Sequence, residues 1–208
     1  MSSDLNVSPR RWRWPAMIAV AAVLAFAGFV ELRDAFADAD EKLSLPGVAN
    51  FGRLSARFYR GAQPEVSAYP SLKALGIDTV VRLSTGEEFI AGERERVEAL
   101  GMHFVSLPWR AADVPTPAQV AAFLGLLHDH PERTVFVHCR EGVDRTGVMV
   151  ALYRVALEHW PVDRAIDEMK AFHYHYLLHP HLQDYVENFP TLLTTDPALQ
   201  AFASQGGQ

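Results

Sequence analysis

The chain has 208 residues, enough for one globular domain of ordinary size with short flanking segments. Apolar residues make up 49% of the sequence and charged residues 21%, a composition that excludes a wholly disordered chain. The formal net charge is -6 and the basic residues are scattered, which argues against a nucleic-acid partner because binding a phosphate backbone requires clustered lysine and arginine.

The N-terminus contains a membrane-directed segment. Residues 14–30 carry no charged side chain, follow Arg10, Arg11 and Arg13, and precede an acidic stretch. A run of about 17 residues is at the lower limit for a spanning helix and slightly long for the apolar part of a secretory signal. Two readings are therefore open: a signal cleaved near Ala37, or an anchor in the inner membrane formed by residues 14–32.

In both readings the positive charges precede the apolar run and the negative charges follow it. The positive-inside rule then directs the C-terminal part outward, which in a bacterium means the periplasm. We expect four regions: a signal peptide or membrane anchor at 1–37, a linker at 38–52, the folded domain at 53–193, and a frayed tail at 194–208.

The folded part alternates short apolar runs with helical patterns. The runs are nearly continuous and therefore indicate strands covered on both faces, at 78–83, 103–107 and 134–137. Helical periodicity between and after them predicts helices at 66–75, 91–100, 117–128, 145–158, 162–172 and around 181–188. This order predicts an α/β fold whose central, mostly parallel sheet of four to five strands is flanked by helices.

The stretch from Thr134 to Gly147 combines a buried strand, a turn and the start of a helix, with Cys139 at the junction. A loop that enters a helix N-terminus points several backbone N–H groups at one place, and the helix dipole adds positive potential, so a dianionic phosphate can bind there. Gly142 allows the backbone to curl around such a group. The same field favours the thiolate form of Cys139, which is the nucleophilic form.

Arg145 follows Cys139 by six residues, close enough across such a loop for its planar guanidinium to bind two phosphoryl oxygens. Thr146 supplies a hydroxyl near the sulfur, suited to stabilising the thiolate when it leaves. The predicted phosphate-binding residues are the whole loop: Arg140, Glu141, Gly142, Val143, Asp144 and Arg145.

Cys139, five intervening residues, Arg145 and Thr146, preceded by His138, resemble the signature of the protein tyrosine phosphatase superfamily. The short domain and the sequence DRTG at 144–147 resemble the dual-specificity branch, especially its small exported bacterial members. The similarity extends from about residue 58 to 172 and includes YRGAQP at 59–64. It implies a phosphoprotein phosphatase of the cysteine-phosphatase fold that needs no cofactor. It also implies hydrolysis of phosphotyrosine, and of phosphoserine and phosphothreonine as further candidates, through a cysteinyl-phosphate intermediate.

The same family uses an aspartic acid on a separate loop as general acid, and Asp113 matches by context because it leaves a strand and precedes a helix. The alternative for Asp113 is a helix N-cap or turn residue, since an acid before Pro-Thr-Pro is common turn chemistry. The resemblance makes Asp144 a loop residue and not the proton donor. It gives His138 a supporting role in hydrogen bonding to the loop backbone.

Other polar residues receive structural interpretations. Arg60 is expected to be structural, tied to a carboxylate. We expect no metal at the histidine cluster, which has no carboxylate or thiol at ligand spacing: His173, His175, His179 and His181. The variable loop positions contain two acids and one base, a rim that repels polyanions and favours phosphoproteins over phosphoinositides.

Two other functions compete with the phosphatase. A sulfurtransferase of the rhodanese kind also places a cysteine after a strand, but Arg145 with Thr146 and a separate Asp113 favours phosphatase chemistry. A non-catalytic phosphate-binding module at the membrane surface would usually have lost the cysteine, the arginine or the acid, and all three are present.

Overall fold

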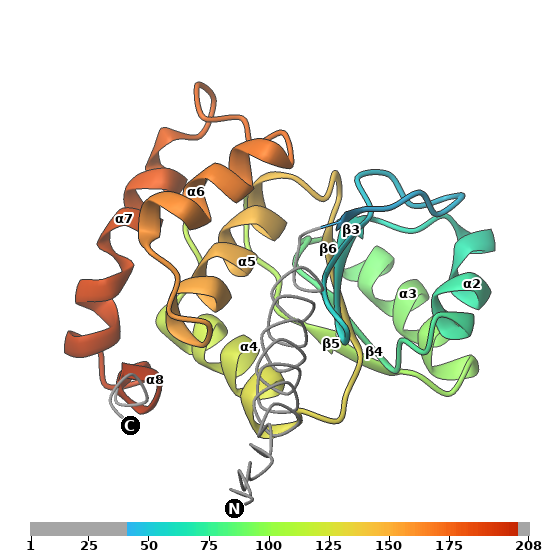
Figure 1. The fold of residues 1–208 in the computed structure, drawn as a ribbon. Coiled ribbons are helices and arrows are strands. Elements are labelled where there is room, and N and C mark those ends of the chain that lie inside the picture. Colours follow the sequence, from blue (N-terminus) through green and yellow to red (C-terminus); the bar gives the residue numbers. More distant parts are fainter. Residues whose placement is uncertain (1–40, 204–208) are drawn as a thin grey trace, which may run out of the picture. The chain divides into compact units, whose positions relative to one another are not determined.

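The computed structural model describes residues 41–203 (Figure 1). The predicted signal or anchor at 1–37, including the span at 14–32, lies outside the described residues. Within 41–203, no helix has both the length and the apolar character needed to cross a membrane. The fold described below is that of the compact unit beginning at Asp40.

The unit begins with three consecutive strands; strands and helices then alternate from Phe58 to Ala156, and helices alone follow. In chain order the elements are β1 (Glu41–Lys42), β2 (Gly52–Ser55), β3 (Phe58–Ala62), η1 (Val66–Ala68), α2 (Tyr69–Ala74), β4 (Thr79–Arg82), α3 (Glu87–Ala99), β5 (His103–Ser106), α4 (Pro117–Asp129), β6 (Val135–Cys139), α5 (Asp144–Ala156), α6 (Val162–Ala171), α7 (Pro180–Thr195) and α8 (Gln200–Ala203).

The strands form one sheet in the order β1-β2-β3-β6-β4-β5. Neighbours from β3 to β5 are parallel, whereas β1 and β2 add antiparallel pairs at one edge. The prediction of an α/β fold with a mostly parallel sheet flanked by helices is confirmed. Five strands of four or five residues agree with the expected number, and the two-residue β1 is an additional edge strand.

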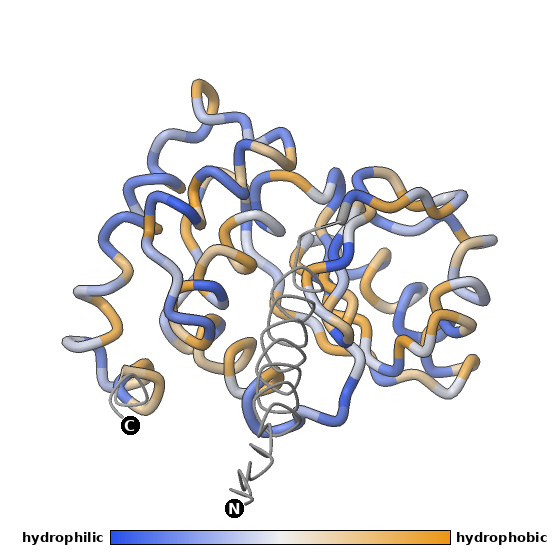
Figure 2. The backbone as a smooth tube through the Cα atoms, viewed as in Figure 1, coloured by the Kyte–Doolittle hydropathy of each residue, from blue (hydrophilic) through white to orange (hydrophobic). Residues whose placement is uncertain are grey.

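Both faces of the sheet are covered, which explains why its strands are nearly continuously apolar. Neighbouring residues of β4 serve opposite faces: Val80 packs with residues of α2 and α3, and Val81 with residues of α4 to α7. The two groups of helices lie on opposite sides of the sheet in Figure 1, and hydrophobic segments line the interior on both sides in Figure 2. Helix α5 is the most enclosed, with nine of its thirteen residues buried.

The parallel register brings the carboxyl ends of three strands together. Ala62 at the end of β3 is paired with Cys139 at the end of β6, and Arg82 at the end of β4 is paired with His138. In open α/β sheets, ligands bind outside the carboxyl ends of the strands. The loops after β3, β4 and β6 therefore meet at the edge where a site is expected.

The packed part of the chain extends beyond the expected boundaries at 53 and 193. Val48 and Phe51, from the expected linker, are buried against β3 and β6. The tail expected to fray from Thr194 is instead packed as far as it is described, because α7 continues to Thr195 and Leu199 is fully buried in the larger core cluster. One buried leucine after a helix creates no periodicity, so the sequence pattern gave no signal for it.

Replacing Leu199 by alanine tests this packing. Truncating a fully buried leucine removes apolar burial and leaves a cavity, so we expect Leu199→Ala to lower the free energy of unfolding by about 2 to 3 kcal/mol. Leu177, which is 78% exposed, is the matched control, and Leu177→Ala should change stability by less than about 0.5 kcal/mol. Urea unfolding measures both, and equal stability of the two variants would contradict the packing of this segment.

Candidate active site

The loop that joins β6 to α5 begins after Cys139 and ends at Asp144. Gly142 in this loop has a φ of 68°, in the left-handed region that favours glycine. A Cβ atom at this position would lie 2.3 Å from the carbonyl carbon of Gly61 and 2.4 Å from the backbone nitrogen of Ala62. Only glycine fits, because the loop passes directly against the end of β3.

Two side chains from other parts of the chain hold the carbonyl of Gly142. Arg60 donates from Nη2 at 3.0 Å, and Asn50 donates from Nδ2 at 2.8 Å. Arg60 is fully buried and its guanidinium lies 3.9 Å from the ring centroid of Phe172. These contacts support a structural role for Arg60, which acts on the backbone of the loop.

Cys139 and Thr146 flank the loop and are both buried. The exposed fraction of Cys139 is 2%, and Thr146 in the first turn of α5 is fully buried. The Thr146 hydroxyl has no hydrogen-bond partner among the described residues. Thr146 Oγ1 is therefore free to donate a hydrogen bond to an anion. Such a bond would offset the cost of burying an unpartnered hydroxyl.

Arg145 connects this loop to the loop that carries the predicted acid. Its Nη1 donates to the carbonyl of Trp109, 3.2 Å away, in the segment between β5 and α4. Asp113 lies in the same segment, is exposed, and donates its backbone N–H to Arg110 in a turn. The N-cap of α4 is Thr116, which forms a capping box with Gln119, so the N-cap alternative for Asp113 is wrong.

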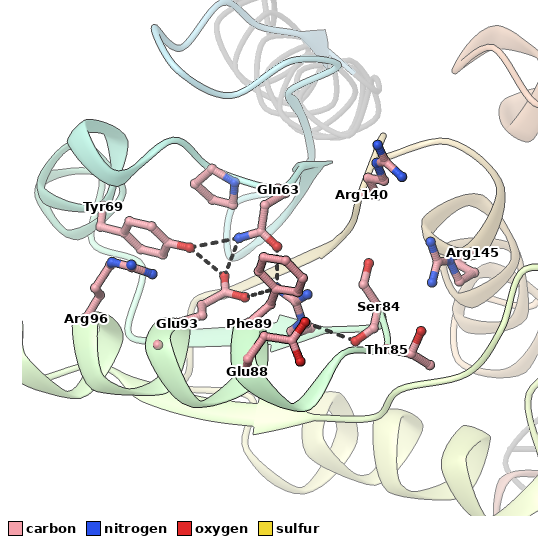
Figure 3. Close-up of a pocket in the computed structure, with 13 residues that line it drawn as sticks. Gln63, Tyr69, Ser84, Thr85, Glu88, Phe89, Glu93, Arg96, Arg140 and Arg145 are labelled. Carbon is pink, nitrogen blue, oxygen red and sulfur yellow. Dashed lines mark hydrogen bonds and ion pairs between the residues drawn. The ribbon is translucent and has the colours of Figure 1, made fainter.

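A pocket of about 640 Å³ opens beside the loop (Figure 3). Its walls come from the segments after β3, β4 and β6 and from one face of α3. The lining residues are Gln63, Pro64, Tyr69, Arg82, Ser84, Thr85, Glu88, Phe89, Gly92, Glu93, Arg96, Arg140 and Arg145. Of the predicted site residues, Arg140 and Arg145 line this pocket, whereas Cys139 and Asp113 lie outside its lining.

Glu93 is the centre of a largely buried polar network in the wall of this pocket. Only 1% of Glu93 is exposed, and its carboxylate accepts hydrogen bonds from Arg82 at 2.6 Å, Tyr69 at 2.6 Å and Gln63 at 2.9 Å. His138 Nε2 lies 2.9 Å from the same carboxylate, and the ring of His138 stacks on Phe136. The residue before Cys139 is thus linked electrostatically to α3.

The partners of Glu93 determine its charge state. Desolvation by burial raises the pKa of Glu93, but His138, Tyr69 and Arg82 together outweigh this effect and lower the pKa to about 2. Burial and the neighbouring Glu93 carboxylate raise the pKa of Tyr69 well above its ordinary value, so Tyr69 stays a donor. Sequence analysis missed this network because Glu93 lies in a charged helical stretch, where nothing distinguishes it from exposed glutamates. Arg82 at the end of a nearly continuous apolar run indicates that a buried acidic partner is needed, but it does not identify Glu93 as that partner.

Asp144 is directed to the segment after α6. Its carboxylate accepts from the backbone N–H of His175 at 3.0 Å and lies 3.0 Å from the His175 ring and 3.9 Å from the His179 ring. The hydrogen bond to Asp144 raises the pKa of His175 above 6.5. Across residues 41–203, no three His, Cys, Asp or Glu side chains are grouped to hold a metal ion. Glu141, Val143 and Asp144 do not line the pocket, so the predicted acidic rim is not part of its wall.

The chain matches the family model described as "DSP-PTPase phosphatase fused to NAD+ Kinase" over residues 47–176. This match covers more than half of the sequence, and it includes β3, β6, the loop after Cys139 and the pocket. The chain therefore belongs to this family of dual-specificity-type phosphatase domains. The resemblance read from Cys139, Arg145 and Thr146 is confirmed at the level of the family.

Individual relatives agree with this assignment. Dual specificity protein phosphatase TpbA of Pseudomonas aeruginosa (strain UCBPP-PA14) is 29% identical over 121 residues, 58% of this chain and 53% of TpbA. The chain thus spans about half the length of this curated relative. The crystal structure of a P. aeruginosa TpbA variant in complex with phosphotyrosine aligns with a TM-score of 0.63 and 25% identity, covering 79% of this chain and 96% of that one. Inositol diphosphatase DSP1 of Oryza sativa subsp. japonica is 26% identical over 140 residues, 64% of this chain and 61% of the relative.

Replacing Glu93 by glutamine tests the buried network. Removing one member of a buried ion pair leaves Arg82 without its counter-charge, so Glu93→Gln should lower the free energy of unfolding by about 3 kcal/mol at pH 7. Because the folded pKa of about 2 is below the ordinary value of 4.5, the contribution of ionised Glu93 is complete above pH 4.5 and is lost as the pH falls toward 2.

The stability difference between wild type and Glu93→Gln should therefore shrink between pH 5 and pH 2 in urea unfolding experiments. Glu95→Gln, an exposed position on the same helix, is the matched control and should have little effect at any pH. A difference that is constant with pH would contradict the charged state of Glu93.

Proposed function

We propose that the chain is a phosphoprotein phosphatase that hydrolyses phosphotyrosine through a cysteinyl-phosphate intermediate on Cys139, with phosphoserine and phosphothreonine as further substrates. The observation that carries the proposal is the loop between β6 and α5. It places Cys139 at the end of a buried strand and Arg145 in the first turn of a helix, on either side of a glycine with positive φ. This arrangement suits an anion-binding loop with a nucleophile at its base.

In the first step, backbone N–H groups at the start of α5 and the guanidinium of Arg145 bind the phosphoryl oxygens. The Cys139 thiolate attacks phosphorus and forms the S–P bond while the P–O bond to the tyrosine oxygen breaks. Asp113 donates its proton to the departing phenolate. Arg145 has five N–H donors, so its contact with Trp109 leaves others for the phosphate.

In the second step, Asp113 takes a proton from a water molecule, whose oxygen attacks phosphorus. The S–P bond breaks, inorganic phosphate leaves, and Asp113 is again protonated for the next cycle. The Thr146 hydroxyl, which is buried and without a partner among residues 41–203, can donate to the leaving thiolate. A stabilised leaving group makes this hydrolysis faster.

The pocket supports an aromatic phosphate ester. A volume of about 640 Å³ exceeds the needs of a phosphoryl group, and Pro64 and Phe89 supply apolar wall beside Arg140 and Arg145. The TpbA variant was solved in complex with phosphotyrosine. Phosphotyrosine is therefore favoured by this apolar wall and by this relative. The preference expected from the acidic loop residues stays a prediction, because neither these acids nor Cys139 are among the residues that line this pocket.

We also propose that the domain is exported to the periplasm. The support is the sequence alone: basic residues, then the apolar run at 14–30, then acidic residues. Fusing residues 1–40 to a reporter enzyme that is active only in the periplasm tests export. Fractionation of the full chain distinguishes an anchor at 14–32, which stays with the membrane, from a cleaved signal, which releases the domain.

Substitutions of the two loop residues test the mechanism. Cys139→Ser should reduce the turnover of a phosphotyrosine peptide by at least about a thousandfold while retaining peptide binding, because the hydroxyl is a poor nucleophile. Arg145→Ala should lose both binding and turnover. Lys170→Ala, exposed on α6, is the control and should behave as wild type. Turnover by Cys139→Ser near the wild-type rate would exclude the cysteinyl intermediate.

The role of Asp113 is tested by its dependence on the leaving group. Asp113→Asn should slow hydrolysis about 10²-fold to 10⁴-fold for substrates whose alcohol leaves poorly. The loss should be much smaller for p-nitrophenyl phosphate, because p-nitrophenolate needs little protonation to leave. Asp129→Asn, at the exposed end of α4, is the control. If Asp113→Asn slowed neither substrate, the general acid would have to be sought elsewhere.

One substrate comparison decides between the candidate reactions. The purified protein should hydrolyse phosphotyrosine peptides faster than inositol phospholipids or inositol diphosphates, and vanadate should inhibit it. It should transfer no sulfur from thiosulfate. Faster hydrolysis of the inositol compounds, or thiosulfate activity, would overturn the proposal.

A further inference from the structure

The pocket contains a second basic side chain at a distance from the phosphate-binding loop. Arg96 lies on the same face of α3 as Phe89, Gly92 and Glu93, as residues three or four apart on a helix do. Residue 92 has no side chain, and the guanidinium of Arg96 lies over it, with Nη1 3.6 Å and Nη2 3.7 Å from where a Cβ of residue 92 would be. The guanidinium therefore lies close to the surface of α3 at Gly92, in the wall of the pocket.

The charges around the pocket are not balanced. Arg82 is paired with the buried Glu93, whereas no hydrogen bond or ion pair within residues 41–203 involves the side chain of Arg96 or Arg140. The remaining acid in the lining is the exposed Glu88. With Arg145 assigned to the phosphoryl group, Arg96 and Arg140 are left as positive charges available to a ligand.

Arg96 and Arg145 lie at opposite ends of the pocket in Figure 3. Phe89, Glu93 and Gln63 lie between them, and Arg140 lies at the rim near Arg145. The pocket wall also includes Ser84, which is 6% exposed and whose hydroxyl has no hydrogen-bond partner in the described part of the chain. A ligand that reaches Arg96 from the loop has to cross the pocket, past Phe89 and the hydroxyl of Ser84.

We propose that Arg96, assisted by Arg140 at the rim, binds a second anionic group of the substrate. The substrates are then peptide segments with a glutamate or aspartate close to the phosphotyrosine. This inference rests on the proposed function. An extended peptide places a carboxylate at a distance from the phosphate, whereas a compact polyphosphate holds its charges next to one another near Arg145. The separation of the two arginines therefore favours the acidic peptide.

A set of phosphotyrosine peptides tests this inference. Each peptide carries a single glutamate at one position within three residues of the phosphotyrosine, and a parent peptide has glutamine at all of them. We expect wild type to have a KM about fivefold lower for at least one glutamate peptide than for the parent, with similar kcat, because an exposed ion pair contributes a modest binding energy.

Arg96→Ala should raise the KM of that peptide to the parent value and leave kcat and the parent peptide unchanged. Arg96→Glu should reverse the preference, because it replaces attraction by repulsion. Arg94→Ala is the matched control: Arg94 is on the same helix and is paired with Glu98 outside this pocket, so its loss should preserve the preference. Equal unfolding midpoints establish that the variants are folded.

Three results would overturn the inference. If wild type hydrolysed all peptides with the same KM, the inference would be wrong and the proposed function would remain intact. If Arg96→Ala changed the KM of every peptide equally, the inference would also be wrong, because Arg96 would then not distinguish the glutamate peptides from the parent. Failure to hydrolyse any phosphotyrosine peptide would remove the proposed function and this inference with it.

Discussion

The close contact between Gly142 and the end of β3 restricts the conformation of the loop between β6 and α5. The parallel pairing of β3 with β6 sets Ala62 opposite Cys139, and the loop after Cys139 then passes so near β3 that no side chain fits at residue 142. Arg60 and Asn50 hold the carbonyl of the same residue from outside the loop. These contacts restrict the backbone of the loop just before α5 begins at Asp144.

The network around Glu93 holds together the elements that form the wall of the pocket. One carboxylate joins α3 to β4 through Arg82, to the segment after β3 through Gln63, and to β6 through His138. His138 precedes Cys139 directly, so the helix that carries Arg96 and the strand that ends at Cys139 share a buried contact. A buried charge of this kind requires all its partners, since removing one leaves the others unpaired in a medium of low dielectric constant.

Sequence reasoning predicted those features that depend on local pattern. Cys139, Gly142 and Arg145 have spacings that are meaningful only at a strand-to-helix turn, and the alternation of apolar runs with helical patterns predicted the sheet and its helices. Features that depend on the direction of a side chain after folding were missed. Glu93 and Arg96 lie in the same charged helical stretch, where no local pattern distinguishes the buried glutamate from the exposed arginine.

The acidic residues of the loop show that proximity in sequence does not fix the direction of a side chain. Glu141 and Asp144 lie close to Cys139 in sequence, which predicted them at the rim of the site. Asp144 instead accepts a hydrogen bond from the backbone of His175, and neither acid lines the pocket. The role of Asp113 stays a prediction, and the structure places this exposed residue in the segment between β5 and α4. Its position relative to Cys139 depends on how that segment packs, including the contact between Arg145 and Trp109.

The enclosure of α5 has a consequence for ionic strength. Nine of its thirteen residues are buried, so the dipole of this helix acts through protein more than through water, and dissolved ions screen it weakly. Arg96 and Arg140 are exposed to solvent, and their attraction for a ligand is screened within a Debye length. Under the proposed function, added salt should thus weaken recognition of the residues that flank a phosphotyrosine more than binding of its phosphate. Selectivity would then be lost at lower salt concentrations than binding.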